Sequence, residues 1–313
     1  MFIAILSTLA GLVLLILAAD RLVVAAVRLS KALGVSAVLI GALVVGLGTS
    51  LPELLVSSLL AREGKLDEAV ANVVGSNTAN VTLVLGLAAL LTVISSERRI
   101  LYREGILMVV AVSGYALTLS DGRVEAWEGG ALLFGLLIAL YLMVTWSLKD
   151  ADAANEAIVE VEEMLGNDTS TQREVITGIV AIVVTVGAAQ LLLTGATTIG
   201  TEVGLSATVL GVMLGVGTSL PEMATALAAA RRKQADLVIG NVLGSNIFNS
   251  LAVGGVAALV GQGVLTEVDG PLLIVMVGTA IVAGLFARSG GRVVRFEGAL
   301  LMFAFVGFFV LTL

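Results

Sequence analysis

The chain of 313 residues contains no cysteine and no histidine, and only 13% of its residues are charged. Without these two residue types, disulfide bridges, thiolate metal sites and zinc–histidine sites are excluded. Nucleophilic catalysis by a Ser–His or Cys–His pair is excluded for the same reason. Proton relay through histidine is excluded too, although a glutamate could still carry a proton. We therefore expect neither an enzyme nor a bound cofactor.

Proline and aromatic residues are also scarce, whereas 58% of the residues are hydrophobic and the mean hydropathy is +1.08. This composition is typical of a polytopic membrane protein rather than of a soluble core. We predict an all-α fold with ten transmembrane helices. The apolar segments of spanning length lie at about 3–30, 36–60, 68–94, 101–119, 127–148, 174–200, 206–230, 236–260, 271–288 and 295–313.

One six-residue motif, Gly-Thr-Ser-Leu-Pro-Glu, occurs twice, at residues 48–53 and again at residues 217–222. A second motif follows each copy, as Asn-Val-Val-Gly-Ser-Asn at 72–77 and Asn-Val-Leu-Gly-Ser-Asn at 241–246. Both motifs recur at the same offset of 169 residues, as 217 − 48 and 241 − 72 give the same difference. Two separated motifs with one offset indicate a duplicated unit.

The duplication predicts three parts: residues 1–148 with five helices, residues 149–173 as an acidic loop, and residues 174–313 with five more helices. Because five is odd, the second unit enters the membrane from the opposite side, which predicts inverted repeats. The segment from Lys149 to Glu174 holds eight acids and two bases, so it accounts for much of the net charge of −7.

Basic residues predict the orientation of these helices in the cell membrane. With the N-terminus outside, thirteen Lys and Arg residues lie at cytoplasmic helix ends and three lie in outer loops. This bias matches the positive-inside rule, so we expect both termini outside and the acidic loop in the cytoplasm. Asp20 and Arg21 interrupt the first helix, and we expect them near the interface, where the adjacent charges screen each other.

Each copy of the first motif brings a carboxylate and a proline into a membrane helix. A charge at mid-bilayer costs about 2.5–3.5 kcal/mol, and such acids usually mark ion pathways. Proline lacks an N–H, so Pro52 and Pro221 are expected to leave the carbonyls four residues earlier without their helical partners. Carbonyls, hydroxyls and a carboxylate form an all-oxygen ligand set that suits Na⁺ and Ca²⁺. The alternative is a proline kink with a structural glutamate.

A two-fold relation between the repeats predicts that Glu53 and Glu222 lie close together near the midplane. Two anions at that depth repel unless a cation lies between them, and two carboxylates match one Ca²⁺ in charge. Four small polar residues beside the motifs are further candidates, namely Ser76, Asn80, Ser245 and Asn249. Their alternative role is hydrogen bonding between helices, which contributes about 0.6 kcal/mol on average.

The paired motifs resemble the two alpha repeats of the cation/calcium antiporter superfamily, specifically the prokaryotic sodium/calcium exchangers, over essentially the whole chain. The resemblance implies a core of helices 2, 3, 7 and 8, and a sliding gate made of helices 1 and 6. It also implies a set of ion ligands in which Na⁺ and Ca²⁺ compete for overlapping positions. By resemblance this set consists of Gly46, Thr49, Ser50, Glu53, Ser76, Asn80, Gly215, Thr218, Ser219, Glu222, Ser245 and Asn249.

One departure concerns Asn80 and Asn249, because some members of the superfamily carry aspartate at one or both positions. The potassium-dependent branch tends to be more acidic there, so the two asparagines argue against K⁺ co-transport.

These observations predict a secondary antiporter with Na⁺ and Ca²⁺ as its substrates, the lipid bilayer as its surroundings and no nucleic-acid partner. A H⁺-coupled Ca²⁺ exchanger on the same scaffold is the alternative, with the two glutamates as proton carriers. A passive cation channel is a weaker alternative. An intramembrane enzyme is the weakest, because only a dicarboxylate mechanism would remain.

Overall fold

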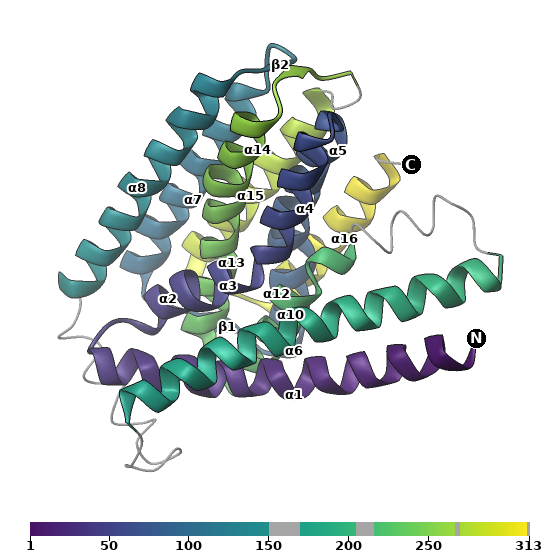
Figure 1. The fold of residues 1–313 in the computed structure, drawn as a ribbon. Coiled ribbons are helices and arrows are strands. Elements are labelled where there is room, and N and C mark those ends of the chain that lie inside the picture. Colours follow the sequence, from purple (N-terminus) through teal and green to yellow (C-terminus); the bar gives the residue numbers. More distant parts are fainter. Residues whose placement is uncertain (150–169, 205–215, 267–269, 312–313) are drawn as a thin grey trace.

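The computed structural model describes residues 1–149, 170–204, 216–266 and 270–311, and most of these residues are helical (Figure 1). The helical elements of the first half are α1 (Phe2–Leu33), α2 (Ala37–Ile40), the π-helix η1 (Gly41–Gly46), α3 (Leu47–Thr49), α4 (Leu51–Arg62), α5 (Leu66–Ala79), the π-helix η2 (Asn80–Val84), α6 (Leu85–Leu91), α7 (Arg98–Thr118) and α8 (Ala126–Lys149). Those of the second half are α10 (Thr171–Glu202), α12 (Leu220–Arg231), α13 (Ala235–Phe248), the π-helix η3 (Asn249–Val253), α14 (Gly254–Val260), α15 (Gly270–Gly290) and α16 (Arg295–Leu311). Most of the predicted acidic loop, residues 150–169, lies outside the described residues.

The elements of the two halves recur at the offset already seen in the motifs. Helices α1 and α10 both contain 32 residues, and their first residues, Phe2 and Thr171, are 169 apart. Helices α4 and α12 have 12 residues each and again begin 169 residues apart, at Leu51 and Leu220. The duplicated sequence therefore produces duplicated elements, including the π-helices η2 and η3, which begin at Asn80 and Asn249.

Burial separates a central group of helices from a peripheral one. Within the described residues, six helices are long and apolar enough to cross a membrane, and a seventh candidate is the pair 37–49 and 51–62, bent by 44°. In the spans 66–91 and 235–260, 83% and 89% of the apolar window is buried, against 28% in α1 and in α10. Apolar side chains exposed on the peripheral helices suit contact with lipid, so the chain is a multi-pass membrane protein.

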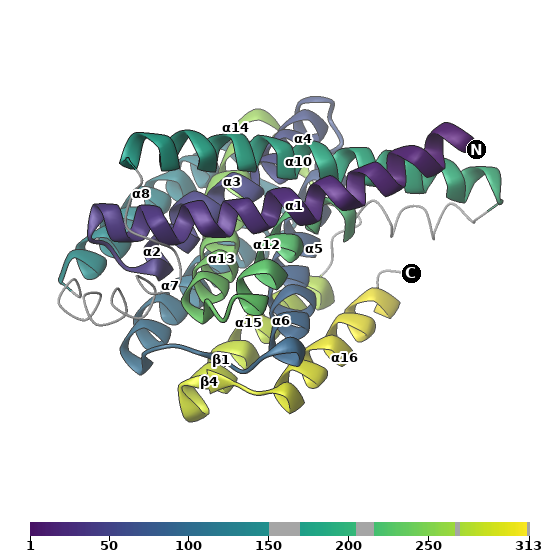
Figure 2. The ribbon, with the colours of Figure 1, turned by 90° about the horizontal axis from the view of Figure 1, so that it is seen from below.

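Helices α1 and α10 lie side by side and cross the rest of the bundle at a steep angle (Figures 1 and 2). They run antiparallel, because contacts join the start of each to the end of the other. The Met1 amino group lies 2.8 Å from Glu202 Oε1, and Arg28 Nη1 donates to Glu174 Oε1 at 3.0 Å. We call α1 and α10 the crossing pair.

Four two-residue strands, which the sequence did not predict, link the halves crosswise among the described residues. Strand β1 (Ile94–Ser95) pairs antiparallel with β4 (Arg292–Val293), and β2 (Arg123–Val124) pairs antiparallel with β3 (Gly263–Val264). The labels β1 and β2 lie at opposite ends of the bundle in Figure 1, and Figure 2 shows β1 beside β4. Each half therefore contributes one strand to the pair at each end of the bundle.

Glycines allow close packing between the first half and helix α13. A Cβ added to Gly244 would lie 2.6 Å from the carbonyl oxygen of Ala42, and one added to Gly41 would lie 3.0 Å from that of Leu237. These neighbours are backbone atoms, which cannot move aside as a flexible side chain can. The small-residue pattern Gly240–Gly244 thus permits contact between backbones, as in other membrane helix pairs.

Asp20 interacts electrostatically with Arg21, as expected, but the main interaction of Asp20 is with another residue. Asp20 accepts two hydrogen bonds of 2.6 Å from Arg232, donated by Nε and Nη2. Consecutive residues of a helix do not face each other, so Asp20 is free to bind a residue of another helix. This ion pair links α1 to the end of α12.

We expect the Asp20–Arg232 pair to contribute little to stability, because both side chains are more than a third exposed. A double-mutant cycle with Asp20→Asn and Arg232→Gln should give a coupling energy of about 0–1 kcal/mol, as for other exposed pairs. Thermal unfolding of the purified single and double variants measures it. A coupling well above that range would indicate that this end of the crossing pair is more desolvated than its exposure implies.

Candidate cation site

Glu53 and Glu222 occupy equivalent places at the first turns of α4 and α12, and only 0% and 1% of their surfaces are exposed. Each helix starts after a break at a serine, where Ser50 and Ser219 have the same backbone angles within 1°. Pro52 and Pro221 therefore stand at a helix start, a position that proline favours because its φ is already helical. The glutamates lie at the positive ends of these helices, which stabilises a negative charge.

The break changes the geometry that a continuous helix would give. Thr49 and Glu53 are four residues apart, which in a continuous helix would place them on one face, but the bend at Ser50 interrupts the helix between them. Thr49 and Ser50 instead lie beside Glu222 of the other half, and Ser50 Oγ donates to Glu222 Oε1 at 2.9 Å. In the reciprocal arrangement, Thr218 lies beside Glu53. Each carboxylate is thus faced by hydroxyls of the opposite motif.

The two carboxylates are close enough to interact with each other electrostatically. Their surroundings differ, however. Glu222 Oε1 accepts from Ser50, whereas neither oxygen of Glu53 has a hydrogen-bond partner among the described residues. The two glutamates therefore have equivalent backbone positions, but only Glu222 has a hydrogen bond that offsets its negative charge.

The carbonyl of Gly46 lies at the same place but is already hydrogen-bonded. It accepts from Ser50 N at 3.1 Å and from Ser245 Oγ at 3.2 Å. Thr49 Oγ1 donates mainly to the carbonyl of Val45, at 2.9 Å. Gly215, the counterpart of Gly46, lies outside the described residues. Side-chain hydroxyls thus hydrogen-bond to carbonyls at the helix break. The carbonyls expected to lose their helical partners are those of Gly48 and Gly217, four residues before the prolines, and that expectation stays a prediction.

Asn80 and Asn249 are buried at the first residues of η2 and η3. Neither amide group has a hydrogen-bond partner in the described part of the chain, at oxygen or at nitrogen. A π-helical turn inside an α-helix is rare and frequently occurs at functional sites. The sequence predicted the asparagines but gave no sign of the turns that carry them.

Several buried oxygens on these elements lack a hydrogen bond among the described residues, and the elements pack against one another, η2 against α12 and η3 against α4. These oxygens are Glu53 Oε1 and Oε2, Glu222 Oε2, Ser76 Oγ, Ser219 Oγ, Asn80 Oδ1 and Asn249 Oδ1. A buried polar group left unsatisfied costs about 1–3 kcal/mol, and a charged one costs more, so such a cluster calls for an explanation. Carboxylate, hydroxyl and amide oxygens are ligands that hard cations prefer.

The described residues contain no group of three or more acidic, histidine or cysteine side chains that could hold a metal ion. The buried oxygens comprise two carboxylates, supplemented by neutral hydroxyl and amide oxygens. Their formal charge of −2 equals the charge of one divalent cation.

Two further asparagines and a hydroxyl were not among the predicted site residues. Asn77 Nδ2 donates to Ser250 Oγ of the other half at 2.9 Å, and Asn246 Nδ2 donates to the carbonyl of Val242 at 2.7 Å. Thr185, on α10, is completely buried, and its hydroxyl has no hydrogen-bond partner in the described part of the chain. The asparagines belong to the repeated motif, which could have indicated them, whereas no sequence signal singles out Thr185.

The apolar bundle and its buried oxygen cluster define a multi-pass membrane protein with an internal polar site. Residues 3–145 and 174–313 match the family described as sodium/calcium exchanger protein. The chain therefore belongs to the sodium/calcium exchanger family, which lies within the cation/calcium antiporter superfamily.

Individual relatives extend over nearly the whole chain. A candidate antiporter, CaxA of Alkalimonas amylolytica, is 36% identical over 98% of both chains. The sodium/calcium exchanger MaX1 of Methanosarcina acetivorans is 28% identical, covering 96% of this chain and 95% of its own. Among solved structures, the sodium-calcium exchanger NCX_Mj soaked with Na⁺ and Sr²⁺ superimposes with a TM-score of 0.84, at 28% identity over 97% of both chains.

Proposed function

We propose that the chain is a secondary antiporter that moves Na⁺ in one direction across the cell membrane and Ca²⁺ in the other. The observation that carries this proposal is the cluster of unsatisfied buried oxygens around Glu53 and Glu222. The names of the relatives, which describe exchange of sodium for calcium, support it. The cations are substrates here, and the proposal needs no cofactor and no enzymatic step.

We also propose that residues 1–148 and 174–313 are inverted five-helix repeats joined by an acidic cytoplasmic segment, 149–173. The equivalent helices α1 and α10 run antiparallel, as an axis in the membrane plane requires. The strand pairs support the same axis, because exchanging the halves converts the β1–β4 pair into the β3–β2 pair. The positive-inside bias then favours termini outside the cell.

The proposed ion ligands are the residues predicted from the sequence, and the structure adds the hydrogen bonds that some of them make. Glu53 and Glu222 supply the negative charge, and the hydroxyl and amide groups complete the coordination. The full set is Gly46, Thr49, Ser50, Glu53, Ser76, Asn80, Gly215, Thr218, Ser219, Glu222, Ser245 and Asn249. A Na⁺ or Ca²⁺ ion would compete with the hydrogen bonds from Ser50 to Glu222 and from Ser245 to Gly46.

The proposed mechanism is movement of the crossing pair past the core, so that the site opens to each side in turn. The contacts between these parts favour such a movement. Gly48 faces the side chain of Ile182, and Gly217 faces that of Leu193. Flexible apolar side chains of α10 therefore contact glycines of the core, which have no side chain to obstruct sliding. An empty site would leave two uncompensated carboxylates facing the apolar crossing pair as it slides past, which is costly. The crossing pair therefore slides only when the site is occupied, which couples the two ion flows.

Ion gradients applied one at a time to proteoliposomes test the proposal. We expect an outward Na⁺ gradient to drive uptake of radioactive Ca²⁺, and a K⁺ gradient to add nothing, because Asn80 and Asn249 carry no charge. The competing function is H⁺-coupled exchange by the same two glutamates. Uptake driven by a pH gradient and indifferent to Na⁺ would establish that alternative, and Ca²⁺ flux without any counter-gradient would indicate a channel.

A further inference from the structure

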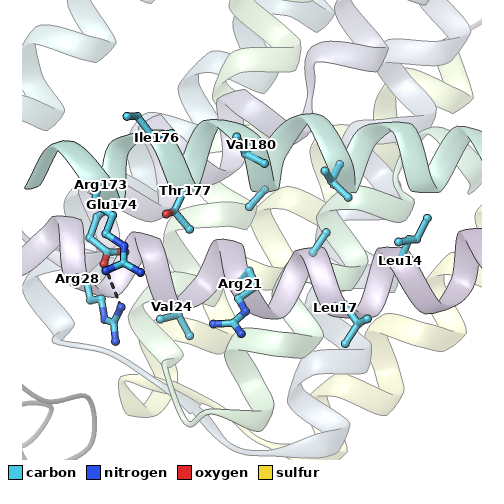
Figure 3. Close-up of a pocket in the computed structure, with 13 residues that line it drawn as sticks. Leu14, Leu17, Arg21, Val24, Arg28, Arg173, Glu174, Ile176, Thr177 and Val180 are labelled. Atoms are coloured by element: carbon cyan, nitrogen blue, oxygen red, sulfur yellow. Dashed lines mark hydrogen bonds and ion pairs between the residues drawn. The ribbon is translucent and has the colours of Figure 1, made fainter. Parts of the chain in front are cut away.

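The crossing pair carries a second polar feature, which lies away from the buried oxygen cluster. A groove of about 530 Å³ runs between α1 and α10 (Figure 3). Its walls are largely apolar and include Leu14, Leu17, Val180 and Val184, all of them exposed. We propose that this groove binds an anionic phospholipid, with the acyl chain against the apolar wall and the phosphate against arginines.

Three arginines line the groove. Arg28 and Arg173 lie at one end beside Glu174, and Arg21 lies nearer the middle, so the lining has a net formal charge of +2 (Figure 3). Glu174 is buried and accepts a hydrogen bond from Arg28. The nearby Asp20 interacts electrostatically with Arg21, but it does not line the groove and its carboxylate is hydrogen-bonded to Arg232. The local charge therefore favours an anion.

Two of these arginines, Arg21 and Arg173, make no side-chain hydrogen bond or ion pair with any residue in the described ranges, although Arg21 interacts electrostatically with Asp20. An exposed guanidinium on a soluble protein is satisfied by water. Beside exposed leucine and valine on a membrane helix it is satisfied less well, so an anionic partner contributes more. Guanidinium binds phosphate through two parallel hydrogen bonds, which makes a phosphate headgroup the natural ligand.

The length of the groove favours a lipid over a small anion or an acidic peptide segment. Arg173 and Val184 are eleven residues apart on α10, which is about 16 Å of helix. An acyl chain laid along the groove would have a comparable length, because half of the roughly 30 Å hydrocarbon core is about 15 Å. An acidic segment or a free phosphate would use the arginines but would leave the apolar wall uncovered.

The test uses the purified full chain in detergent with three probes. These are phosphatidylglycerol, phosphatidylcholine with the same acyl chains, and glycerol 3-phosphate, which lacks the chains. Native mass spectrometry counts retained lipid, and thermal unfolding measures the shift that each probe causes. We expect retention and a raised melting temperature with phosphatidylglycerol, and little effect from the other two.

The double variant Arg21→Gln/Arg173→Gln should bind phosphatidylglycerol about 30-fold more weakly, since each basic residue near an anionic lipid contributes about fivefold. The matched control Arg62→Gln/Arg123→Gln removes two arginines elsewhere and should bind as the parent does. Val180→Trp keeps both arginines, fills the groove and should also lose retention, which serves as the test if the double variant does not fold.

Three results would overturn the proposal. The first is unchanged phosphatidylglycerol retention in the double variant or in Val180→Trp. The second is equal retention of phosphatidylcholine, which would show that charge is irrelevant. The third is an equal thermal shift with glycerol 3-phosphate, which would identify a small-anion site. The proposal does not depend on which ions the chain transports.

Discussion

Replacing Glu53 or Glu222 by glutamine should abolish Na⁺-driven Ca²⁺ uptake into proteoliposomes. Each substitution keeps the shape of the side chain but removes half of the negative charge available to a divalent ion. Breaking a buried charge pair typically costs about 3–5 kcal/mol, which corresponds to a loss of at least about 100-fold in affinity. Equilibrium binding of Ca²⁺ to the purified variants measures the same loss without transport.

Stability should change in the opposite direction, which separates loss of function from misfolding. Without ions, the glutamine variants should melt at or above the temperature of the parent chain, because an unpartnered buried carboxylate is replaced by a neutral group. The increase should be larger at Glu53, which has no hydrogen-bond partner among the described residues, than at Glu222, which accepts from Ser50. The stabilisation by Ca²⁺, about 2.7 kcal/mol at 100 times the dissociation constant in the parent, should disappear.

Glu63→Gln provides the control, because Glu63 lies in an exposed loop beside Lys65 and far from the membrane core. It should transport and melt as the parent does. Near-normal uptake by both Glu53→Gln and Glu222→Gln would reject the proposed site, whatever their stability.

The paired glutamates could be predicted from the sequence because the duplication places the same motif at two equivalent positions. Two motifs at one offset indicated equivalent places, and the structure buries both acids among oxygens. The break at Ser50 could not be predicted in this way, because a proline in a membrane helix is expected to interrupt hydrogen bonds inside that helix. It begins a new helix instead, and this turns Thr49 and Ser50 toward Glu222 rather than Glu53.

Interactions between residues that are far apart in the sequence could not be predicted from the sequence either. Asp20 and Arg232 are 212 residues apart, and nothing local indicates that α1 passes the end of α12. The same holds for the partnership of Arg28 with Glu174, and for the strand pairs that link the halves. The π-helices depend on how a helix packs against its neighbours rather than on its residue types, so Asn80 and Asn249 gave no local signal of them.

Replacing Gly244 by valine should prevent assembly of the core, the second large effect that we expect. The added Cβ would lie 2.6 Å from the carbonyl oxygen of Ala42, so either α13 or the chain at Ala42 has to move. Overpacking against side chains costs about 1–3 kcal/mol, and a clash with backbone falls at or above the top of that range. Gly46 and Ser245 lie in the same contact, so the movement would also separate Ser245 Oγ from the Gly46 carbonyl.

Gly114→Ala is the control, because it also adds a Cβ to a glycine of a membrane helix, on α7, where no described atom lies within 4 Å of the new Cβ. It should be neutral or stabilise by up to about 1 kcal/mol, as glycine is the poorer helix former. The melting temperature, the yield of monodisperse protein and Ca²⁺ binding should fall together in Gly244→Val and stay unchanged in Gly114→Ala. If Gly244→Val kept full Ca²⁺ binding, the ion site would not require close contact between the first half and α13. The geometry argues against that outcome, because the contact that Gly244 permits also positions Ser245 beside Gly46.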